Sequence, residues 1–180
     1  MSDRKWRTWE VIGLLIVLVL GNLLHFVYDW TGQNTVAAAF AAVNESTWEH
    51  MKLLAVPWIV WSLIEWLALR GQGGNVLSAR AAGLLAGLVL IPAAFYTYQG
   101  VLGQNIDWVN ILIFQAAVLL AFTVSWVIQS KGRLSGKGWQ AMSLVILLLV
   151  WALFVLWTYR TPQLAIFADP MTGRVGLPQG

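Results

Sequence analysis

The sequence predicts an all-α integral membrane protein with five transmembrane helices and a short interfacial or re-entrant segment. Hydrophobic residues make up 59% of the chain, whereas a soluble domain has about 45–50%. Charged residues make up only 11%, against about 25% in soluble domains, so there are too few of them to cover a water-facing surface. The apolar residues also gather in runs of about 20, the length that a helix needs to cross a bilayer.

Five apolar runs are long enough to span a membrane, and the pieces between them contain the glycine, asparagine and serine residues typical of loops. We treat residues 1–180 as a single membrane domain that ends in an extended tail, 159–180. The tail contains turn chemistry at Asp169-Pro170 and Thr172-Gly173. We expect it to fold back over the outer face as a partial lid, with Phe167 as its apolar anchor. The predicted spans are 11–30, 50–69, 81–99, 108–129 and 139–158.

The positions of lysine and arginine predict the orientation of these spans. With five spans, three basic residues, Lys52, Arg160 and Arg174, fall on one side. Cytoplasmic loops are richer in Lys and Arg, so we expect a cytoplasmic N-terminus and an extracytoplasmic C-terminus in the inner (plasma) membrane. Several of the 12 tryptophans fall near the predicted interfaces. The sequence contains no stripe of basic residues of the kind that binds nucleic acid. The eight basic residues on the other side are Arg4, Lys5, Arg7, Arg70, Arg80, Lys131, Arg133 and Lys137.

Residues 31–43 include TVAAAFAAV, which is apolar but too short to span a membrane, and we expect an interfacial or re-entrant segment here. The next residues, Ser46-Thr47-Trp48-Glu49, form a capping-box pattern. The Ser46 hydroxyl is expected to accept a hydrogen bond from the Glu49 amide, and the Glu49 carboxylate to reach back. The second spanning helix is therefore predicted to begin near Thr47.

Polar side chains concentrate in the predicted outer half of the bundle. Asn22, His25 and Asp29 share one face of the first helix, because they are spaced i, i+3 and i+7. In the inner half only Glu65 is a candidate buried acid, and Arg70 is near enough in sequence to pair with it. Ionisable groups within a bilayer usually face the bundle interior or a cavity, so we expect a pocket at the outer face. Its candidate residues are Asn22, His25, Asp29, Asn44, Glu45, Glu49, His50, Tyr96, Asp107 and Asn110.

Three stretches resemble an uncharacterised family of small prokaryotic integral-membrane proteins, a domain of unknown function. They are GNLLHFVYDWTGQN, VNESTWEHMKLL and IPAAFYTYQGVLGQNIDWVNILIF. The second stretch contains the family's Val-Asn-Glu-Ser-x-Trp-Glu-His pattern. The tail is similar at Phe167, Asp169, Pro170, Thr172 and Gly173, but Arg174-Val175-Gly176 lacks an expected aromatic residue. The resemblance implies a membrane protein and no particular activity.

One hypothesis for the polar cluster is a metal site that binds zinc or iron. Two histidines and a carboxylate are a ligand set that both metals use, and a remaining carboxylate would act as a general base. A metal-dependent hydrolase acting on a lipid-like substrate would follow. The spacing matches no recognised catalytic motif, so enzymatic activity stays open. The candidate ligands are His25, Asp29, Glu45, Glu49 and His50.

Two other hypotheses need no metal. A proton-coupled small-molecule carrier would use a histidine–carboxylate pair that titrates, although the sequence shows no internal repeat of the kind that many carriers have. A scaffold or subunit of a membrane complex would use the cluster as a hydrogen-bond network that fixes the 31–43 segment. The partners considered are therefore the lipid bilayer, a lipid-like ligand or another membrane protein. The oligomeric state stays open.

Overall fold

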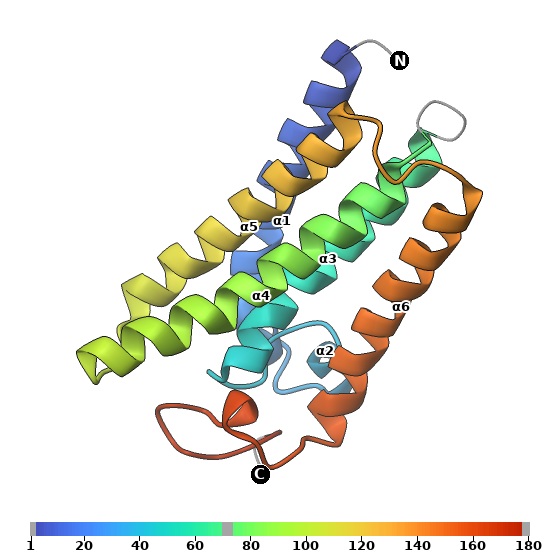
Figure 1. The fold of residues 1–180 in the computed structure, drawn as a ribbon. Coiled ribbons are helices and arrows are strands. Elements are labelled where there is room, and N and C mark those ends of the chain that lie inside the picture. The colour runs from blue at the N-terminus through green and yellow to red at the C-terminus, as the bar shows by residue number, and fades with distance from the viewer. Residues whose placement is uncertain (1–2, 70–73, 178–180) are drawn as a thin grey trace.

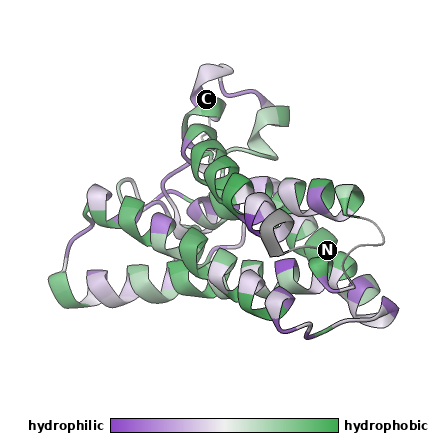
Figure 2. Ribbon diagram, turned by 90° about the horizontal axis from the view of Figure 1, so that it is seen from above, coloured by the Kyte–Doolittle hydropathy of each residue, from purple (hydrophilic) through white to green (hydrophobic). Residues whose placement is uncertain are grey.

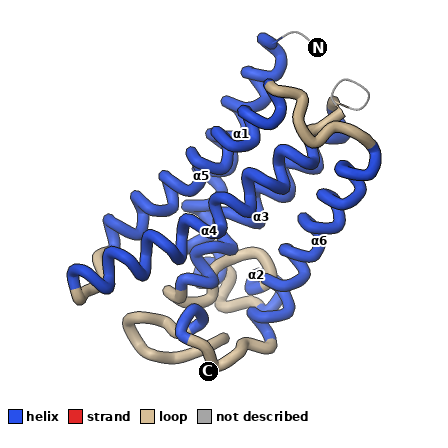
Figure 3. The backbone as a smooth tube through the Cα atoms, viewed as in Figure 1, coloured by secondary structure: helices blue, strands red, loops and turns tan. Residues whose placement is uncertain are grey.

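The computed structural model describes residues 3–69 and 74–177, and within them every long element is an α-helix (Figures 1 and 3). No strand occurs in these ranges; the nearest feature is an isolated bridge between Ala168 and Val175. The elements are α1 (Asp3–Trp30), α2 (Thr35–Ala38), α3 (Thr47–Ala68), α4 (Val76–Leu102), α5 (Asp107–Ser130), α6 (Lys137–Tyr159) and the short 3-10 helix η1 (Ala165–Phe167).

Five of these helices, α1, α3, α4, α5 and α6, are long and apolar enough to cross a membrane. Apolar residues dominate along them (Figure 2). The protein is thus a multi-pass membrane protein, as the sequence predicts. Successive spans run in opposite directions, so the two ends of the chain lie at opposite ends of the bundle (Figure 1). We call the end with His25 and His50 the histidine end, and the end with Glu65 and Arg80 the arginine end.

The helices α3 and α4 form the centre, with α1 and α5 on one side and α6 on the other (Figure 1). The close packing of α4 depends on two glycines. A Cβ on Gly83 would lie 2.5 Å from the carbonyl oxygen of Ala121, and one on Gly87 would lie 2.7 Å from Leu54. Small residues allow such close approach in membrane bundles, where van der Waals packing provides much of the association energy.

The segment between α1 and α3 is held at the histidine end. Its only helical part is α2, a single turn whose N-terminus is capped by the Asn34 side chain. The remaining residues turn back toward α3. The hydroxyl of Tyr159 donates to the carbonyl oxygen of Thr35, and Lys52 Nζ donates to that of Ala38 at 2.8 Å. The predicted short segment is therefore present, anchored to α3 and α6.

The helix α3 begins at Thr47, as predicted, and the Oγ atom of Ser46 accepts a hydrogen bond from the Glu49 amide at 3.3 Å. The prediction that the Glu49 carboxylate reaches back to the cap is wrong. The Glu49 carboxylate accepts from the amide of Val43 at 3.2 Å instead. It turns away from the cap because a buried lysine, Lys52, lies one turn along the helix, 2.5 Å from Glu49 Oε2.

The tail folds back over the histidine end, as the sequence predicts. Phe167 is 3% exposed, and its ring centroid lies 5.0 Å from that of Trp48 and 5.6 Å from that of Trp157. Further along, the Asn44 side-chain amide donates to the carbonyl oxygen of Gly176 at 2.9 Å. The tail and the loop before α3 therefore support each other.

At the arginine end, Glu65 is buried, but its partner is Arg80. Arg80 Nε donates to Glu65 Oε2 at 2.6 Å, and Arg80 Nη1 donates to Glu10 Oε2 at 3.2 Å. Arg70, the partner suggested by sequence distance, lies outside the described residues. Arg80 belongs to α4 and is fully buried, so its assignment to a water-facing basic loop is wrong. Two carboxylates and two aromatic rings, Trp58 and Phe122, surround it instead.

Candidate metal centre and adjoining cavity

Three side chains converge at the histidine end, namely His25 from α1, Glu45 from the preceding loop and His50 from the first turns of α3. Each offers one ligand atom, and these atoms all lie within 4.8 Å of one another. Nε2 of His25 is 3.5 Å from Glu45 Oε1, and Nε2 of His50 is 3.6 Å from Glu45 Oε2. Residues 25 positions apart in sequence thus meet at one point.

These distances are longer than hydrogen bonds between nitrogen and oxygen, which are about 2.7–3.2 Å. They are close to the spacing of ligand atoms around a tetrahedral metal. With metal–ligand bonds of about 2.0–2.1 Å, two ligands of such a metal lie roughly 3.3 Å apart. The separations therefore leave room for an ion between the three side chains.

The ring of His50 is oriented by its own helix start. Its Nδ1 lies 3.0 Å from the carbonyl oxygen of Ser46, a contact in which Nδ1 carries the proton and donates. The Nε2 atom, on the other side of the ring, faces Glu45. Such a backbone partner on the second ring nitrogen is the usual way in which proteins fix a metal-ligating histidine.

The position of Glu45 depends on the tail. The backbone amide of Glu45 donates to Asp169 Oδ2 at 3.4 Å. The other carboxylate oxygen of Asp169 accepts from the amides of Met171 and Thr172 at 2.7 and 3.1 Å. Through Asp169, the turn that follows η1 is tied to the loop that carries Glu45. The Glu45 side chain itself lies between the two histidines.

A cavity of about 420 Å³ adjoins the three side chains. Ligand pockets in proteins are usually about 300–1,000 Å³, so this one is large enough for a small molecule or part of a larger one. Its walls come from α1, the loop before α3, α3, the loop before α5, α5 and the tail. The lining residues are Gly21, Asn22, His25, Phe26, Glu45, His50, Leu53, Asn105, Asp107, Asn110, Ile111, Phe114 and Met171.

Several of the predicted pocket residues lie in this cavity, and they belong to different elements. Asn22 lines it from α1, with its amide nitrogen bonded to the carbonyl oxygen of Leu18 at 2.7 Å. Asp107 and Asn110 line it from the first turn of α5. The convergence of α1, α3 and α5 brings together residues that are more than 80 positions apart in sequence.

Tyr96, also a predicted pocket residue, is 41% exposed and does not line the described cavities near the site. Its neighbour Tyr98 reaches the polar wall instead. The Tyr98 hydroxyl lies 2.6 Å from Asn110 Oδ1 and 2.9 Å from Asn105 Oδ1. The two tyrosines are two residues apart in α4 and so point to nearly opposite sides of the helix.

Asp29 and Asn44 line a second cavity of about 250 Å³, next to the first. Asp29 is exposed at the end of α1 and is not part of the converging cluster. Although it shares a helix face with His25, it lies one turn further along, which is about 5.4 Å of rise. The same cavity is lined by Arg174 and Asp169 from the tail.

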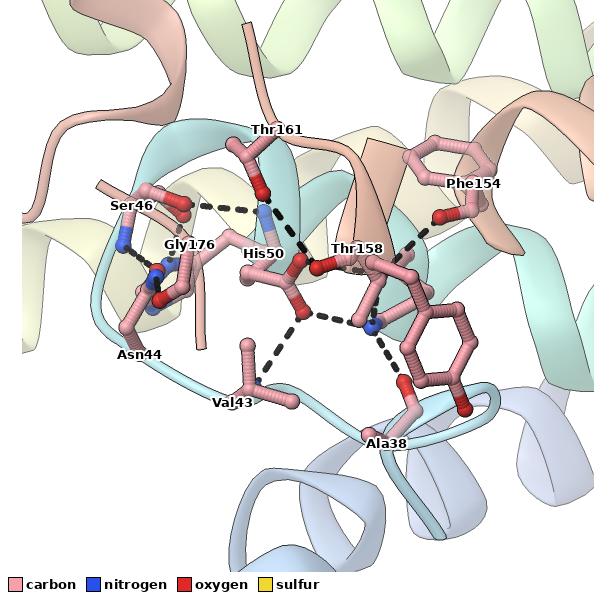
Figure 4. Close-up of polar contacts among 12 residues, drawn as sticks. Ala38, Val43, Asn44, Ser46, His50, Phe154, Thr158, Thr161 and Gly176 are labelled. Atoms are coloured by element: carbon pink, nitrogen blue, oxygen red, sulfur yellow. Dashed lines mark hydrogen bonds and ion pairs between the residues drawn. The ribbon is translucent and has the colours of Figure 1, made fainter. Parts of the chain in front are cut away.

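Glu49 is directed into a separate buried network. Its Oε1 accepts from the Thr158 hydroxyl at 3.2 Å, and Lys52 Nζ also donates to Thr158 Oγ1 at 2.9 Å. Figure 4 shows Ala38, Val43 and Thr158 around these contacts, to one side of His50. Of the five predicted metal ligands, the structure thus brings three together and directs Asp29 and Glu49 elsewhere.

Tyr98 is not among the pocket residues predicted from the sequence. The burial of Lys52 and Arg80 was not predicted either. A signal for Tyr98 exists, because Ile91, Phe95 and Tyr98 follow a helical spacing and the first two are buried. The burial of Lys52 could have been inferred from its position in the sequence. It follows Glu49 by three residues, within a run otherwise typical of a buried helix.

Comparison with protein families gives a match over nearly the whole chain. A family model described as "Family of unknown function (DUF6512)" covers residues 1–177. No curated protein and no solved structure matches the chain.

Proposed function

From the residues of this chain, which belongs to the DUF6512 family, a family of unknown function, we propose that it binds a divalent transition metal. The proposed ligands are His25 Nε2, His50 Nε2 and one carboxylate oxygen of Glu45. The supporting observation is the convergence of one ligand atom from each residue within 4.8 Å of one another, with the two histidine–glutamate separations at 3.5 and 3.6 Å.

The choice of metal follows from the ligand chemistry. Two imidazoles and one carboxylate suit zinc or iron, and the chain has no cysteine that would favour a thiolate site. Three protein ligands leave one tetrahedral position open, as in catalytic zinc sites. When bound, such an ion acts as a Lewis acid and activates water. The adjoining cavity provides space for a molecule at the open position, which favours metal-dependent hydrolysis.

The exposed fraction of the ligands also supports the proposal. The His25 and His50 side chains are 29% and 20% exposed, whereas that of Glu45 is 46% exposed. Solvent and metal therefore have access to the cluster. By contrast, the ion pairs of Lys52 and Arg80 are almost completely enclosed, as structural pairs commonly are.

The metal content of the full chain tests the proposal directly. The protein would be purified in mild detergent without chelator, incubated with Zn²⁺, freed of excess metal and analysed by mass spectrometry. We expect about one equivalent in the wild type and its loss in His25→Ala, His50→Ala and Glu45→Gln. Asp29→Asn is the matched control, since Asp29 is a nearby carboxylate outside the cluster, and it should retain the metal.

Gel filtration would show whether each variant stays folded. Absence of metal from the folded wild type would overturn the proposal. Retention of a full equivalent in both histidine variants would also overturn it.

We further propose that the histidine end faces the extracytoplasmic side of the plasma membrane. With Arg80 and Lys52 buried, they no longer count as loop charges. Removing Arg80 from the eight basic residues leaves seven, and removing Lys52 from the three leaves two. Seven basic residues on the side of the arginine end against two on the side of the histidine end still favour a cytoplasmic arginine end.

The cysteine-free chain allows a simple test of this orientation. A membrane-impermeant maleimide added to intact cells should label Thr172→Cys and leave Lys131→Cys unlabelled. The reverse pattern would contradict the orientation.

A further inference from the structure

The 420 Å³ cavity is lined by Gly21, Leu53 and Phe114 where α1, α3 and α5 meet. There, a Cβ on Gly21 would lie 2.4 Å from the Phe114 ring and 2.9 Å from the Leu53 carbonyl oxygen. Glycine thus lets the three helices meet at this level. Toward the histidine end they enclose the cavity, which extends from this contact to His25, Glu45 and His50.

Part of the rim of the cavity is apolar and lies on the outside of the bundle. Phe26 of α1 and Ile111 of α5 both line the cavity, yet they are 50% and 54% exposed. Both residues belong to membrane-spanning helices. In a bilayer this part of the rim faces lipid, so it offers a molecule dissolved in the membrane a lateral route into the cavity.

The apolar rim directly adjoins the candidate metal centre. The ring of Phe26 is edge-on to that of His25, with centroids 5.0 Å apart. On the other wall, Ile111 follows Asn110, and both line the cavity. An occupant would therefore place a polar group at the histidines and an apolar chain along Phe26 and Ile111, which describes an amphiphile.

The charges of the lining residues select the type of polar group. The lining residues that the structure describes include Glu45 and Asp107 but no lysine or arginine. A divalent ion with these two carboxylates has a net charge of zero. A phosphate or carboxylate head would therefore find no cationic side chain here, whereas anion-binding sites generally present arginine or lysine.

We propose that the cavity accepts a membrane amphiphile with an uncharged head, such as a long-chain ester or amide of a small alcohol or amine. The head lies at the centre formed by His25, Glu45 and His50, and the chain leaves between Phe26 and Ile111. The position of the head rests on the proposed metal-binding function. The preference for an uncharged head rests on it too, because the ion neutralises the two carboxylates, whereas the lateral entry rests on the cavity itself.

A photoreactive monoacylglycerol with a diazirine in its acyl chain tests this proposal. The full chain, loaded with zinc in mild detergent, would be irradiated with the probe and analysed by peptide mapping. We expect crosslinks to the peptides of α1 and α5 that line the rim. Unlabelled monooleoylglycerol should compete, and monooleoyl phosphatidic acid should compete on the order of tenfold less well.

Two variants of α5 provide a matched pair. Ile111→Trp places an indole at the rim and should reduce crosslinking on the order of tenfold, a difference of about 1.4 kcal/mol in binding. Leu112→Trp makes the same change at the next residue, which is 56% exposed but does not line the cavity, and it should crosslink like the wild type. Both variants should retain zinc.

The outcomes separate this inference from the proposed function. If the zinc-loaded wild type gives no specific crosslink, the amphiphile is overturned while the metal site stands. If the phosphatidic acid competes as well as the neutral lipid, the preference for an uncharged head is overturned. If crosslinking follows the predicted pattern in protein that binds no zinc, the lateral cavity is supported and the metal site fails.

Discussion

Lys52 Nζ lies 2.5 Å from Glu49 Oε2, and both side chains are buried at the start of α3. This pair also bonds to α6 through Thr158, and to the loop before α3 through the carbonyl oxygen of Ala38 and the amide of Val43. One ion pair thus connects three parts of the chain at the histidine end. It satisfies backbone groups that would otherwise be buried without partners, which is costly within a membrane.

Removing only the lysine should be strongly destabilising. Lys52→Met would leave Glu49 as a buried charge without its counter-ion, and breaking a buried pair in this way typically costs about 3–5 kcal/mol. The free energy of unfolding would be measured by SDS titration in mixed micelles. Lys131→Met is the control, because Lys131 is exposed, and it should change the free energy by less than about 0.5 kcal/mol.

The double variant Lys52→Met/Glu49→Gln separates the ion pair from the packing. A glutamine at position 49 can still accept from the amide of Val43, and it leaves no uncompensated charge. We therefore expect the double variant to be more stable than Lys52→Met alone. A double variant that lost the sum of the two single effects would show that the two side chains act independently.

The sequence predicted the spanning helices well because their signal is local. An apolar run of about 20 residues has few alternatives to a membrane helix. The start of α3 was predictable for a similar reason, since Ser46 lies directly before the helix that it caps. Segments such as α2 are harder, because their conformation depends on distant partners such as Tyr159.

The polar residues were sorted by depth along the predicted helices, and depth alone cannot determine their partners. Glu45 and Glu49 are four residues apart, yet Glu45 lies between the histidines and Glu49 bonds to Lys52. The same limit explains Glu65, which was paired with the nearest arginine in sequence. Its actual partner, Arg80, is on the next helix, and only the packing of α3 against α4 brings them together.

The buried arginine is expected to require its planar shape as well as its charge. Arg80 donates from Nε to Glu65 and from Nη1 to Glu10, and its Cζ lies over the rings of Trp58 and Phe122, 5.2 and 4.9 Å from their centroids. A lysine retains the charge but cannot reproduce both donors and the planar contact. We expect Arg80→Lys to lose about 1.5–3 kcal/mol, the value of one hydrogen bond to a charged group.

The measurement for Arg80→Lys is the thermal unfolding midpoint in mild detergent. Arg133→Lys makes the same replacement at an exposed position in the loop between α5 and α6 and should leave the midpoint nearly unchanged. Equal midpoints for Arg80→Lys and the wild type would mean that charge alone holds this site together.

The contact at Gly21 leads to the last prediction. Gly21→Ala would place a Cβ against the Phe114 ring and 2.9 Å from the carbonyl oxygen of Leu53, which cannot move without disturbing α3. Overpacking of this kind usually costs about 1–3 kcal/mol. Gly100→Ala is the matched control, because Gly100 is also helical but has no atom within 4 Å of an added Cβ. There, alanine should stabilise the helix by about 0.5–1 kcal/mol. SDS titration of both variants should therefore give shifts of opposite sign, whereas stabilisation by both would mean that α1 does not approach α3 and α5 this closely.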